Sequence, residues 1–304
     1  MSPDYIQSTF STKDLALLSG IKAHTIRMWE KRYNLFEPDR TQTNIRTYDL
    51  KELKKLLNVA YLVRQGARIS SVAELTESQM QKQVEKEVAK KQSGDYHQEA
   101  LLMATLGYDV AAFQGVLKKL LEQDSLEQVY GQILMPFIQN VGMLWHSGTL
   151  DMTHEHFATQ MIQRQLLLHT AALDVVPKRA ETPFFILFLP DNEIHSLGLE
   201  FAQYLILKRG MDVLMLGPSV PLDGLTKFIT STQKVVFLSF FTVRPAAPDL
   251  VHYIQEARSL LLAQNAHALW ILGARAGEIP DALCSPQLLK FTTIPSFIRT
   301  LEAL

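Results

Sequence analysis

Three residues that follow an apolar run have the types and the spacing of a metal-binding loop. Glu193, His195 and Gly198 come after residues 184–189, whose apolar run predicts a buried strand, and before a helical stretch that Gly210 closes. Ligands of open α/β sheets bind at the carboxyl ends of the strands. An imidazole there can coordinate a metal while a nearby carboxylate orients the ring. A single histidine at a strand end is also commonly a hydrogen-bonded or exposed residue.

A second group of aromatic and polar residues flanks a predicted break between two helices. Trp145 and His146 end one helical pattern, and Glu155 and His156 fall in the first turn of the next. Taken singly, such a tryptophan is typical of core packing, and an acid in a first helical turn interacts favourably with the helix dipole. Whether this group has a structural or a chemical role therefore depends on the elements around it.

The residues after 178 predict the sheet that would carry the first loop. Apolar runs recur at 184–189, 213–216, 235–238, 269–272 and 290–293, with helical patterns between them. This alternation predicts a Rossmann-like, doubly wound parallel sheet of about five strands. A dinucleotide fingerprint is absent, because no G-x-G-x-x-G follows the first strand.

Four helical patterns precede the sheet, at residues 95–106, 110–123, 126–145 and 152–173. Short polar breaks separate them, and short connections favour antiparallel neighbours, so we expect a four-helix bundle. Before the bundle, residues 76–93 are rich in Gln, Lys and Glu and nearly free of apolar anchors. That composition predicts an exposed linker or a frayed helix.

The first quarter of the chain has the pattern of a winged helix-turn-helix. Ser11 to Asp14 predicts a capping box for a helix that ends near Gly20, and a second helix follows from about Ala23 to Arg32. The polar stretch 40–47 has the turn chemistry of a β-wing, and residues 50–65 predict a strongly periodic helix.

The charges of this quarter indicate a nucleic-acid partner. Residues 1–75 hold 12 Lys and Arg against 8 Asp and Glu, whereas the other 229 residues hold 18 against 23. Each arginine by itself is more often a solvated surface charge. The run R-x-W-E-x-R-Y at residues 27–33, with further basic and aromatic residues up to 48, closely resembles the winged helix of MerR-type transcription regulators. Such proteins bind double-stranded operator DNA as dimers, and the candidate DNA contacts are His24, Thr25, Arg27, Arg32, Tyr33, Arg40, Arg46 and Tyr48.

The two chemical groups resemble parts of cobalamin-binding proteins. The E-x-H-x-x-G pattern that contains His195 resembles the loop whose histidine is the lower ligand of cobalt. The W-x9-E-H pattern of Trp145, Glu155 and His156 resembles the cap of cobalamin-binding photoreceptors of the CarH type. The resemblance implies that this cap covers the adenosyl group of adenosylcobalamin, and that His146 takes the upper cobalt position after photolysis.

The same resemblance extends to residues that would contact the nucleotide tail of the cofactor. Ser239 matches a serine that reaches the buried tail, and Gly273 matches the first of two glycines. Two positions depart from the family's S-x-L and G-G patterns, because this chain has Phe241 and Ala274 there. We expect both larger side chains to narrow the slot for the dimethylbenzimidazole tail.

The order of these parts predicts a multidomain α and α/β regulator of the CarH type. We expect a winged helix over 1–76, a linker over 77–93, a helical cap over 94–178 and a Rossmann-like domain over 179–304. The resemblance implies a repressor that binds operator DNA in the dark as an adenosylcobalamin-bound homo-oligomer, a dimer or a tetramer. Light would break the cobalt–carbon bond and release the DNA.

The residues leave two other functions open. The chain could be a light-independent MerR-type regulator that uses cobalamin as an effector or responds to an antirepressor. It could also be a corrinoid methyltransferase subunit, although a winged helix argues against that. No nucleophile–base triad or phosphate loop supports an enzyme, so we expect a regulator without catalytic activity.

Composition indicates a cytoplasmic protein. Cys284 is the one cysteine, so an internal disulfide is excluded. The first residues lack the apolar region of a signal peptide, and no apolar run reaches the roughly 18 residues needed to span a bilayer. We therefore expect no membrane partner.

Overall fold

The computed structural model describes residues 9–91, 94–173, 182–229, 234–262 and 267–304. The chain divides into two compact units, Met1–Met161 and Ile162–Leu304. Helix α10 (Met152–Ala171) runs through the boundary between them.

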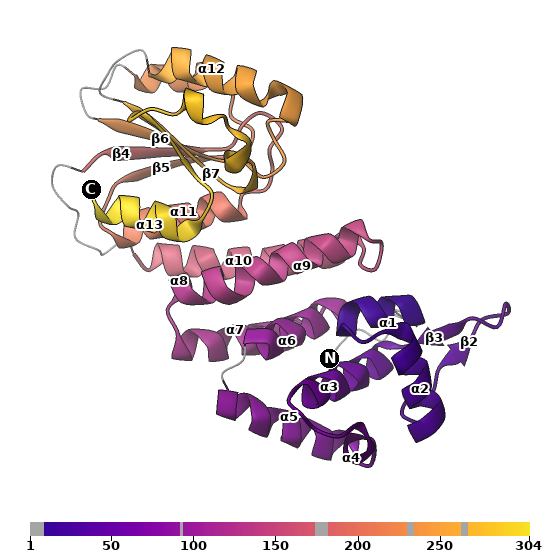
Figure 1. The fold of residues 1–304 in the computed structure, drawn as a ribbon. Coiled ribbons are helices and arrows are strands. Elements are labelled where there is room, and N and C mark those ends of the chain that lie inside the picture. The colour runs from indigo at the N-terminus through magenta and orange to yellow at the C-terminus, as the bar shows by residue number, and fades with distance from the viewer. Residues whose placement is uncertain (1–8, 92–93, 174–181, 230–233, 263–266) are drawn as a thin grey trace. The chain divides into compact units, whose positions relative to one another are not determined.

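The first unit begins with a winged helix (Figure 1). Ser11 caps α1 (Thr12–Ser19), because its hydroxyl accepts the Asp14 N–H while the Asp14 carboxylate accepts the Ser11 N–H at 2.8 Å. This confirms the predicted capping box, and Gly20 ends the helix at a φ of 71°. Helix α2 (Ala23–Tyr33) follows, and β1 (Phe10–Ser11), β3 (Arg46–Tyr48) and β2 (Asp39–Arg40) form an antiparallel sheet in that order.

Helix α3 (Leu50–Arg64) buries an apolar face against the rest of this domain, as its periodicity predicted, and α4 (Ile69–Ala73) follows it. The segment expected to be an exposed linker or a frayed helix contains helix α5 (Glu77–Lys91), which packs against α3. Met80 and Val84 lie one turn apart and are 1% and 2% exposed. Two apolar residues at this spacing are enough to anchor a helix on a neighbour, and an argument from average composition overlooks them.

Four helical stretches follow, as the periodicity predicted. They are α6 (Gly94–Leu106), α7 (Val110–Gln123), the run from α8 (Leu126–Val129) to α9 (Met135–His146), and α10. A π-helical turn, Tyr130–Leu134, joins α8 to α9. Pro136 lies in the first turn of α9 and has no N–H to donate, so the widened turn before it accommodates its ring within one continuous helix.

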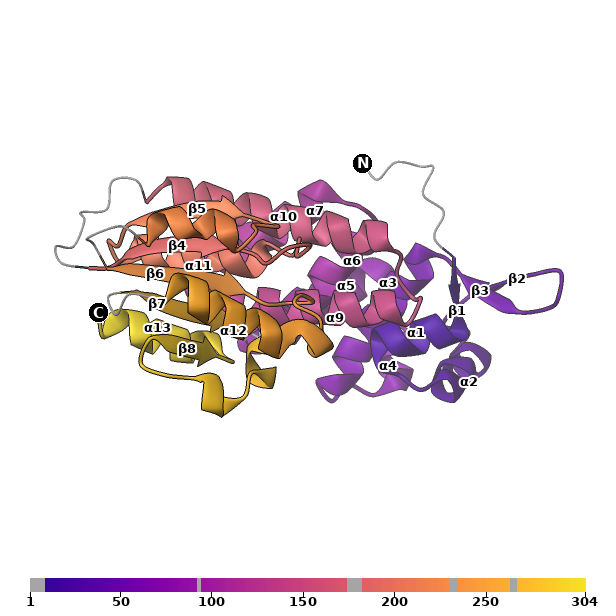
Figure 2. The same cartoon turned by 90° about the horizontal axis from the view of Figure 1, so that it is seen from above.

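The second unit is a parallel sheet with helices on both faces. Its strands are β4 (Phe184–Phe188), β5 (Val213–Gly217), β6 (Val235–Phe240), β7 (Ala268–Leu272) and β8 (Leu288–Phe291). Figure 2 shows their order across the sheet, β5-β4-β6-β7-β8. Helices α11 (Leu197–Lys208) and α13 (Ile294–Glu302) cover one face, and α12 (Leu250–Leu261) covers the other (Figure 1). The predicted Rossmann-like architecture is confirmed.

Two predicted elements of this unit differ in detail. The helix expected after β5 is a 3-10 turn, Asp223–Phe228, and the last strand begins two residues earlier than expected. The order in which strands are added changes direction at β4, because β5 and β6 pair with its opposite edges. This is the switch point of the sheet. The carboxyl ends of β4 and β6 therefore border the place where ligands of such sheets bind.

None of the helices in the described ranges is long and apolar enough to cross a membrane.

Candidate functional site

The loop after β4 is organised around a buried carboxylate. Glu193 is 0% exposed, and its Oε1 accepts the N–H groups of Ile194 at 2.9 Å and of His195 at 3.0 Å. Its Oε2 accepts the N–H groups of Val243 at 2.7 Å and of Arg244 at 2.8 Å, which come from the loop after β6. Glu193 thereby ties the two loops at the switch point together.

The same carboxylate fixes the ring of His195. The distance from His195 Nδ1 to Glu193 Oε1 is 2.5 Å. Burial by itself would raise the pKa of Glu193, but the bonds from the His195 ring and from the backbone N–H groups outweigh it and lower the pKa to about 2. The carboxylate is thus ionised at neutral pH and keeps a proton on Nδ1 of the His195 ring.

This geometry suits a histidine that ligates a metal. The His195 side chain is 49% exposed, and Nε2 lies on the edge of the ring opposite the Glu193 contact. A carboxylate on the first ring nitrogen orients the ring and raises the basicity of the second. The structure therefore brings the predicted pair together as expected. Within the described ranges, no group of three or more His, Cys, Asp or Glu side chains is placed to hold a metal ion.

Gly198, in the first turn of α11, is in contact with the last residue of β6. A Cβ at position 198 would lie 2.3 Å from Cζ of Phe240 and 2.5 Å and 2.6 Å from its Cε atoms. Only the bare backbone of a glycine leaves room for that ring. Phe240 is 9% exposed, so its ring fills the space between the start of α11 and the end of β6.

The other predicted tail contacts lie differently from expectation. Ser239 is 0% exposed, and its hydroxyl donates to the Phe188 carbonyl at 3.0 Å. Phe241 is 1% exposed in the core cluster on the α12 side, and the Ala274 side chain is exposed. Gly273 has a φ of 109°, and a Cβ there would meet the Phe241 carbonyl oxygen at 2.3 Å. Phe240, rather than Phe241 or Ala274, therefore narrows this end of the sheet.

One part of this site fits a corrinoid, and another part does not. The Glu193–His195 pair has the donor chemistry and the orientation of a lower cobalt ligand. The space beside Gly198 holds the Phe240 ring, so a nucleotide tail enters there only if that ring moves.

The predicted cap residues lie in the first unit, around the break between α9 and α10. Trp145 is 40% exposed at the end of α9, and its ring centroid is 4.6 Å from that of His146. In the first turn of α10, His156 Nδ1 is 2.8 Å from Glu155 Oε2, and Glu155 Oε1 accepts the Thr159 hydroxyl at 2.8 Å. An exposed indole and a paired glutamate and histidine can contact the upper face of a large ligand.

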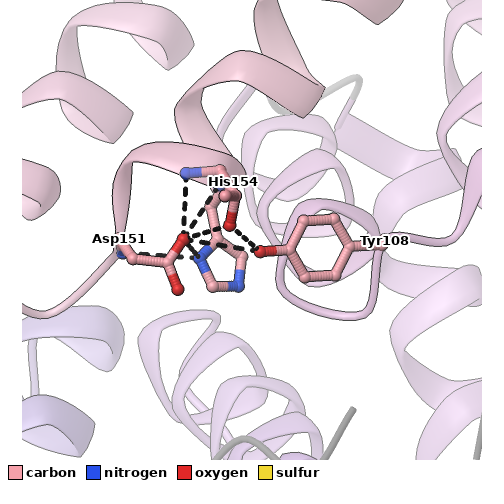
Figure 3. Close-up of polar contacts among 4 residues, drawn as sticks. Tyr108, Asp151 and His154 are labelled. Carbon is pink, nitrogen blue, oxygen red and sulfur yellow. Dashed lines mark hydrogen bonds and ion pairs between the residues drawn. The ribbon is translucent and has the colours of Figure 1, made fainter. Parts of the chain in front are cut away.

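A cluster that sequence reasoning missed holds the start of α10 (Figure 3). His154 is 7% exposed, its Nδ1 is 3.0 Å from Asp151 Oδ1, and its ring stacks on Tyr108 at 4.6 Å between centroids. The Tyr108 hydroxyl contacts Asp151 and Thr153. The cluster fixes the helical turn that carries Glu155. An aspartate three residues before a histidine at a helix start was the available signal.

Four of the eight predicted DNA-binding residues are exposed. On α2, His24, Arg27 and Arg32 are exposed, and Thr25 and Tyr33 are half-buried. The Arg32 guanidinium lies 5.4 Å from the centroid of the Tyr33 ring. On the wing, Arg40 is exposed and donates to Asn44 at 2.7 Å. Basic side chains of α2 and of the wing are thus open to solvent.

Two residues of the predicted DNA contact bind a glutamate instead. Arg46 Nε donates to Glu30 at 3.0 Å, and the Tyr48 hydroxyl donates to the same carboxylate at 3.1 Å. Tyr48 is 1% exposed, so its ring belongs to the core of the winged helix. The structure assigns Tyr48 to the attachment of the wing to α2 rather than to the exposed side chains.

Two family models match the part of the chain that precedes the parallel sheet. A family model described as "MerR HTH family regulatory protein" matches residues 10–79, and one described as "B12 binding domain" matches residues 97–166. The chain is 29% identical over 288 residues to the HTH-type transcriptional repressor CarH of Myxococcus xanthus, covering 91% of this chain and 93% of that protein. Over most of its length the chain is similar to a CarH repressor. It joins a MerR helix-turn-helix, which implies DNA binding, to a B12-binding domain, which implies a cobalamin partner.

The chain is also similar to a second curated protein and to one solved structure. The chain is 27% identical over 250 residues to the HTH-type transcriptional repressor CarA of Myxococcus xanthus, with 79% of each chain covered. The structure of the Methanosarcina barkeri monomethylamine corrinoid protein superposes with a TM-score of 0.57 at 14% identity, covering 70% of this chain and all of that one. At that identity the likeness shows the fold alone. The curated relatives are named as repressors, in agreement with a regulator rather than an enzyme.

Proposed function

We propose that this chain is a transcriptional repressor whose hold on operator DNA depends on adenosylcobalamin and light. The observation that carries the proposal is the Glu193–His195 pair, a ring fixed on Nδ1 by a buried, ionised carboxylate at the carboxyl end of β4. Nothing in the packing of the sheet requires a half-exposed histidine to be oriented in this way. A metal ligand does require it.

Each group of residues has a role in this proposal. His195 would hold cobalt from below through Nε2, with Glu193 fixing the ring. Trp145, Glu155 and His156 would contact the adenosyl group, and His146 would take the upper position once that group has left. When bound, the cofactor supplies a cobalt–carbon bond that light breaks.

The output is DNA binding by the winged helix. Arg27 and Arg32 on α2 and Arg40 on the wing present positive charge to the phosphates, which positions the domain on the duplex. The cofactor would favour the arrangement of the chain that binds the operator, and loss of the adenosyl group would favour the other arrangement. A ligand shifts such an equilibrium only as far as its affinities for the two arrangements differ.

The test uses the full chain and a duplex that the chain itself selects from a random library. We expect adenosylcobalamin in darkness to raise operator affinity about tenfold or more, and green light to reverse that gain. The visible absorption spectrum should show histidine coordination of cobalt. His195→Ala should abolish the spectral change and the gain in affinity. His252→Ala, an exposed histidine on α12, is the matched control and should behave as the wild type.

The outcome that defeats the proposal is an operator affinity that stays constant with and without cofactor, in darkness and in light. A second candidate function would then apply, a MerR-type repressor controlled by a protein antirepressor. The contact of Phe240 with Gly198 favours this alternative, because it leaves no room beside Gly198 for a nucleotide tail. Under the alternative, His195→Ala leaves repression unchanged in a reporter assay.

A further inference from the structure

The ring of Phe240 occupies the place where the sheet would receive a ligand. Phe240 ends β6, and Gly198 lies in the first turn of α11, directly after the loop that carries His195. Because β5 and β6 lie on opposite sides of β4, the carboxyl ends of β4 and β6 form the topological switch point. The outer edge of the ring lies where a Cβ of residue 198 would be, within 2.3–2.6 Å of that position.

A corrinoid bound through His195 needs this space for chemical reasons. If His195 held cobalt, its nitrogen would replace the dimethylbenzimidazole of the cofactor's own nucleotide tail as the ligand. The replaced tail would then need space beside the histidine. The backbone at Gly198, with no side chain, is the part of α11 near His195 that a second group can approach closely. In this chain Phe240 already makes that approach.

We infer that Phe240 competes with the nucleotide tail of cobalamin for the space beside Gly198, an inference that rests on the proposed function. Complete cobalamin binds only when the ring is displaced. Cobinamide, a corrinoid without the nucleotide, binds with the ring in place. Phe240 is thus a specificity-determining residue that shifts the preference of this chain from complete towards tail-less corrinoids.

The neighbouring phenylalanine provides a matched control. Phe240 contacts Gly198 of α11, whereas Phe241, the residue after β6, packs with residues of α12 on the other face of the sheet. Phe241 packs in the core cluster on the α12 side, with its ring 5.8 Å from that of Tyr253. A Phe→Leu change at either position removes a similar volume, but only the change at 240 enlarges the space beside Gly198.

The experiment titrates full-length protein with aquocobalamin and, separately, with aquocobinamide, and follows the visible absorption of cobalt. We expect the wild type to bind cobinamide at least as tightly as cobalamin. Phe240→Ala should tighten cobalamin binding about tenfold or more and leave the affinity for cobinamide within about twofold. Phe240→Leu should shift the ratio in the same direction and carries the test if the alanine variant does not fold. Phe241→Leu should leave the ratio of the two affinities unchanged.

A second measurement tests the contact without any cofactor. Gly198→Ala should strongly destabilise the wild-type protein in urea, because the new methyl group would overlap the Phe240 ring. In the Phe240→Ala background the same change should have a much smaller effect, so the two substitutions form a non-additive cycle.

The results that overturn the inference are distinct from those that defeat the proposed function. An equal gain in affinity for both corrinoids, an unchanged ratio, no cobalamin binding by either Phe240 variant, or an additive cycle would each overturn it. An operator affinity that ignores a bound corrinoid defeats the proposed function while leaving the ratio of affinities intact.

Discussion

The buried Glu193 side chain connects the loop after β4 to the loop after β6. Its two carboxylate oxygens accept five hydrogen bonds, from Ile194, from the backbone and ring of His195, and from the backbone of Val243 and Arg244. An amide offers one oxygen and two hydrogens in place of two acceptors. Replacing the carboxylate therefore leaves buried N–H groups without a partner, and each such group costs about 1–3 kcal/mol.

Glu193→Gln should lower the free energy of unfolding by about 2–4 kcal/mol at neutral pH. The measurement is urea unfolding followed by circular dichroism, with the wild type beside it. Asp191→Asn removes an exposed charge from the same loop and should stay within about 0.5 kcal/mol of the wild type. Equal stability of the Glu193→Gln and Asp191→Asn variants would show that the carboxylate is not the organising centre of the loop.

At the scale of elements, some residues of α2 and the wing are placed to contact DNA, and others hold the wing against α2. Arg27 and Arg32 are exposed on α2, whereas Arg46 and Tyr48 on β3 bind the Glu30 carboxylate of α2. The first pair is placed to neutralise phosphates, and the second pair holds the wing against the helix. These two roles have different dependence on salt, because only phosphate contacts release counterions from DNA.

Arg27→Ala and Arg32→Ala should each weaken operator binding and reduce the slope of log affinity against log salt by about one per protomer. Tyr48→Phe should weaken binding less and leave the slope unchanged, since it loosens the wing without removing a phosphate contact. Fluorescence anisotropy over a range of salt concentrations measures both quantities. Lys118→Ala, which removes an exposed charge from α7, is the control. If Lys118→Ala changed the slope as much as Arg27→Ala does, the assignment of Arg27 and Arg32 as phosphate contacts would be wrong.

At the scale of the whole molecule, the predicted cap and the DNA-binding domain belong to the same compact unit. Arg64 of α3 pairs with Glu99 of α6, and the rings of Tyr61 and Tyr96 meet edge to face at 5.6 Å. Only residues of this unit, with Trp145 and Glu155 among them, are expected to touch the adenosyl group. Light that removes the group would therefore act directly on the unit that carries the winged helix.

We expect size-exclusion chromatography with light scattering to show this coupling as a change of assembly. Adenosylcobalamin added in darkness should increase the mass of the assembly about twofold or more, since symmetric oligomers grow by whole protomers or dimers. Green light should reverse the increase. Cyanocobalamin, which has no adenosyl group, should leave the mass unchanged. A mass that does not change with adenosylcobalamin, or with light, would contradict the light mechanism.

The sequence by itself determined those parts that depend on local patterns. The Ser11–Asp14 capping box, the turn at Gly20, the periodic α3 and the alternating strands and helices of the second unit follow from spacing and propensity over a few residues. The juxtaposition of Glu193 and His195 was also readable, because the two residues are close in the chain. Met80 and Val84 show the limit, since the anchoring of α5 depends on the neighbour it packs against.

The tertiary structure decided every contact between residues far apart in the chain. Phe240 and Gly198 are 42 positions apart, and only the parallel pairing of β4 with β6 brings them together. The same holds for the Val243 and Arg244 N–H groups on Glu193, for Tyr48 on Glu30, and for Tyr108 on His154. A sequence pattern shows which face of its own element a side chain is on. It does not show what lies opposite, because that depends on the register and packing of the folded chain.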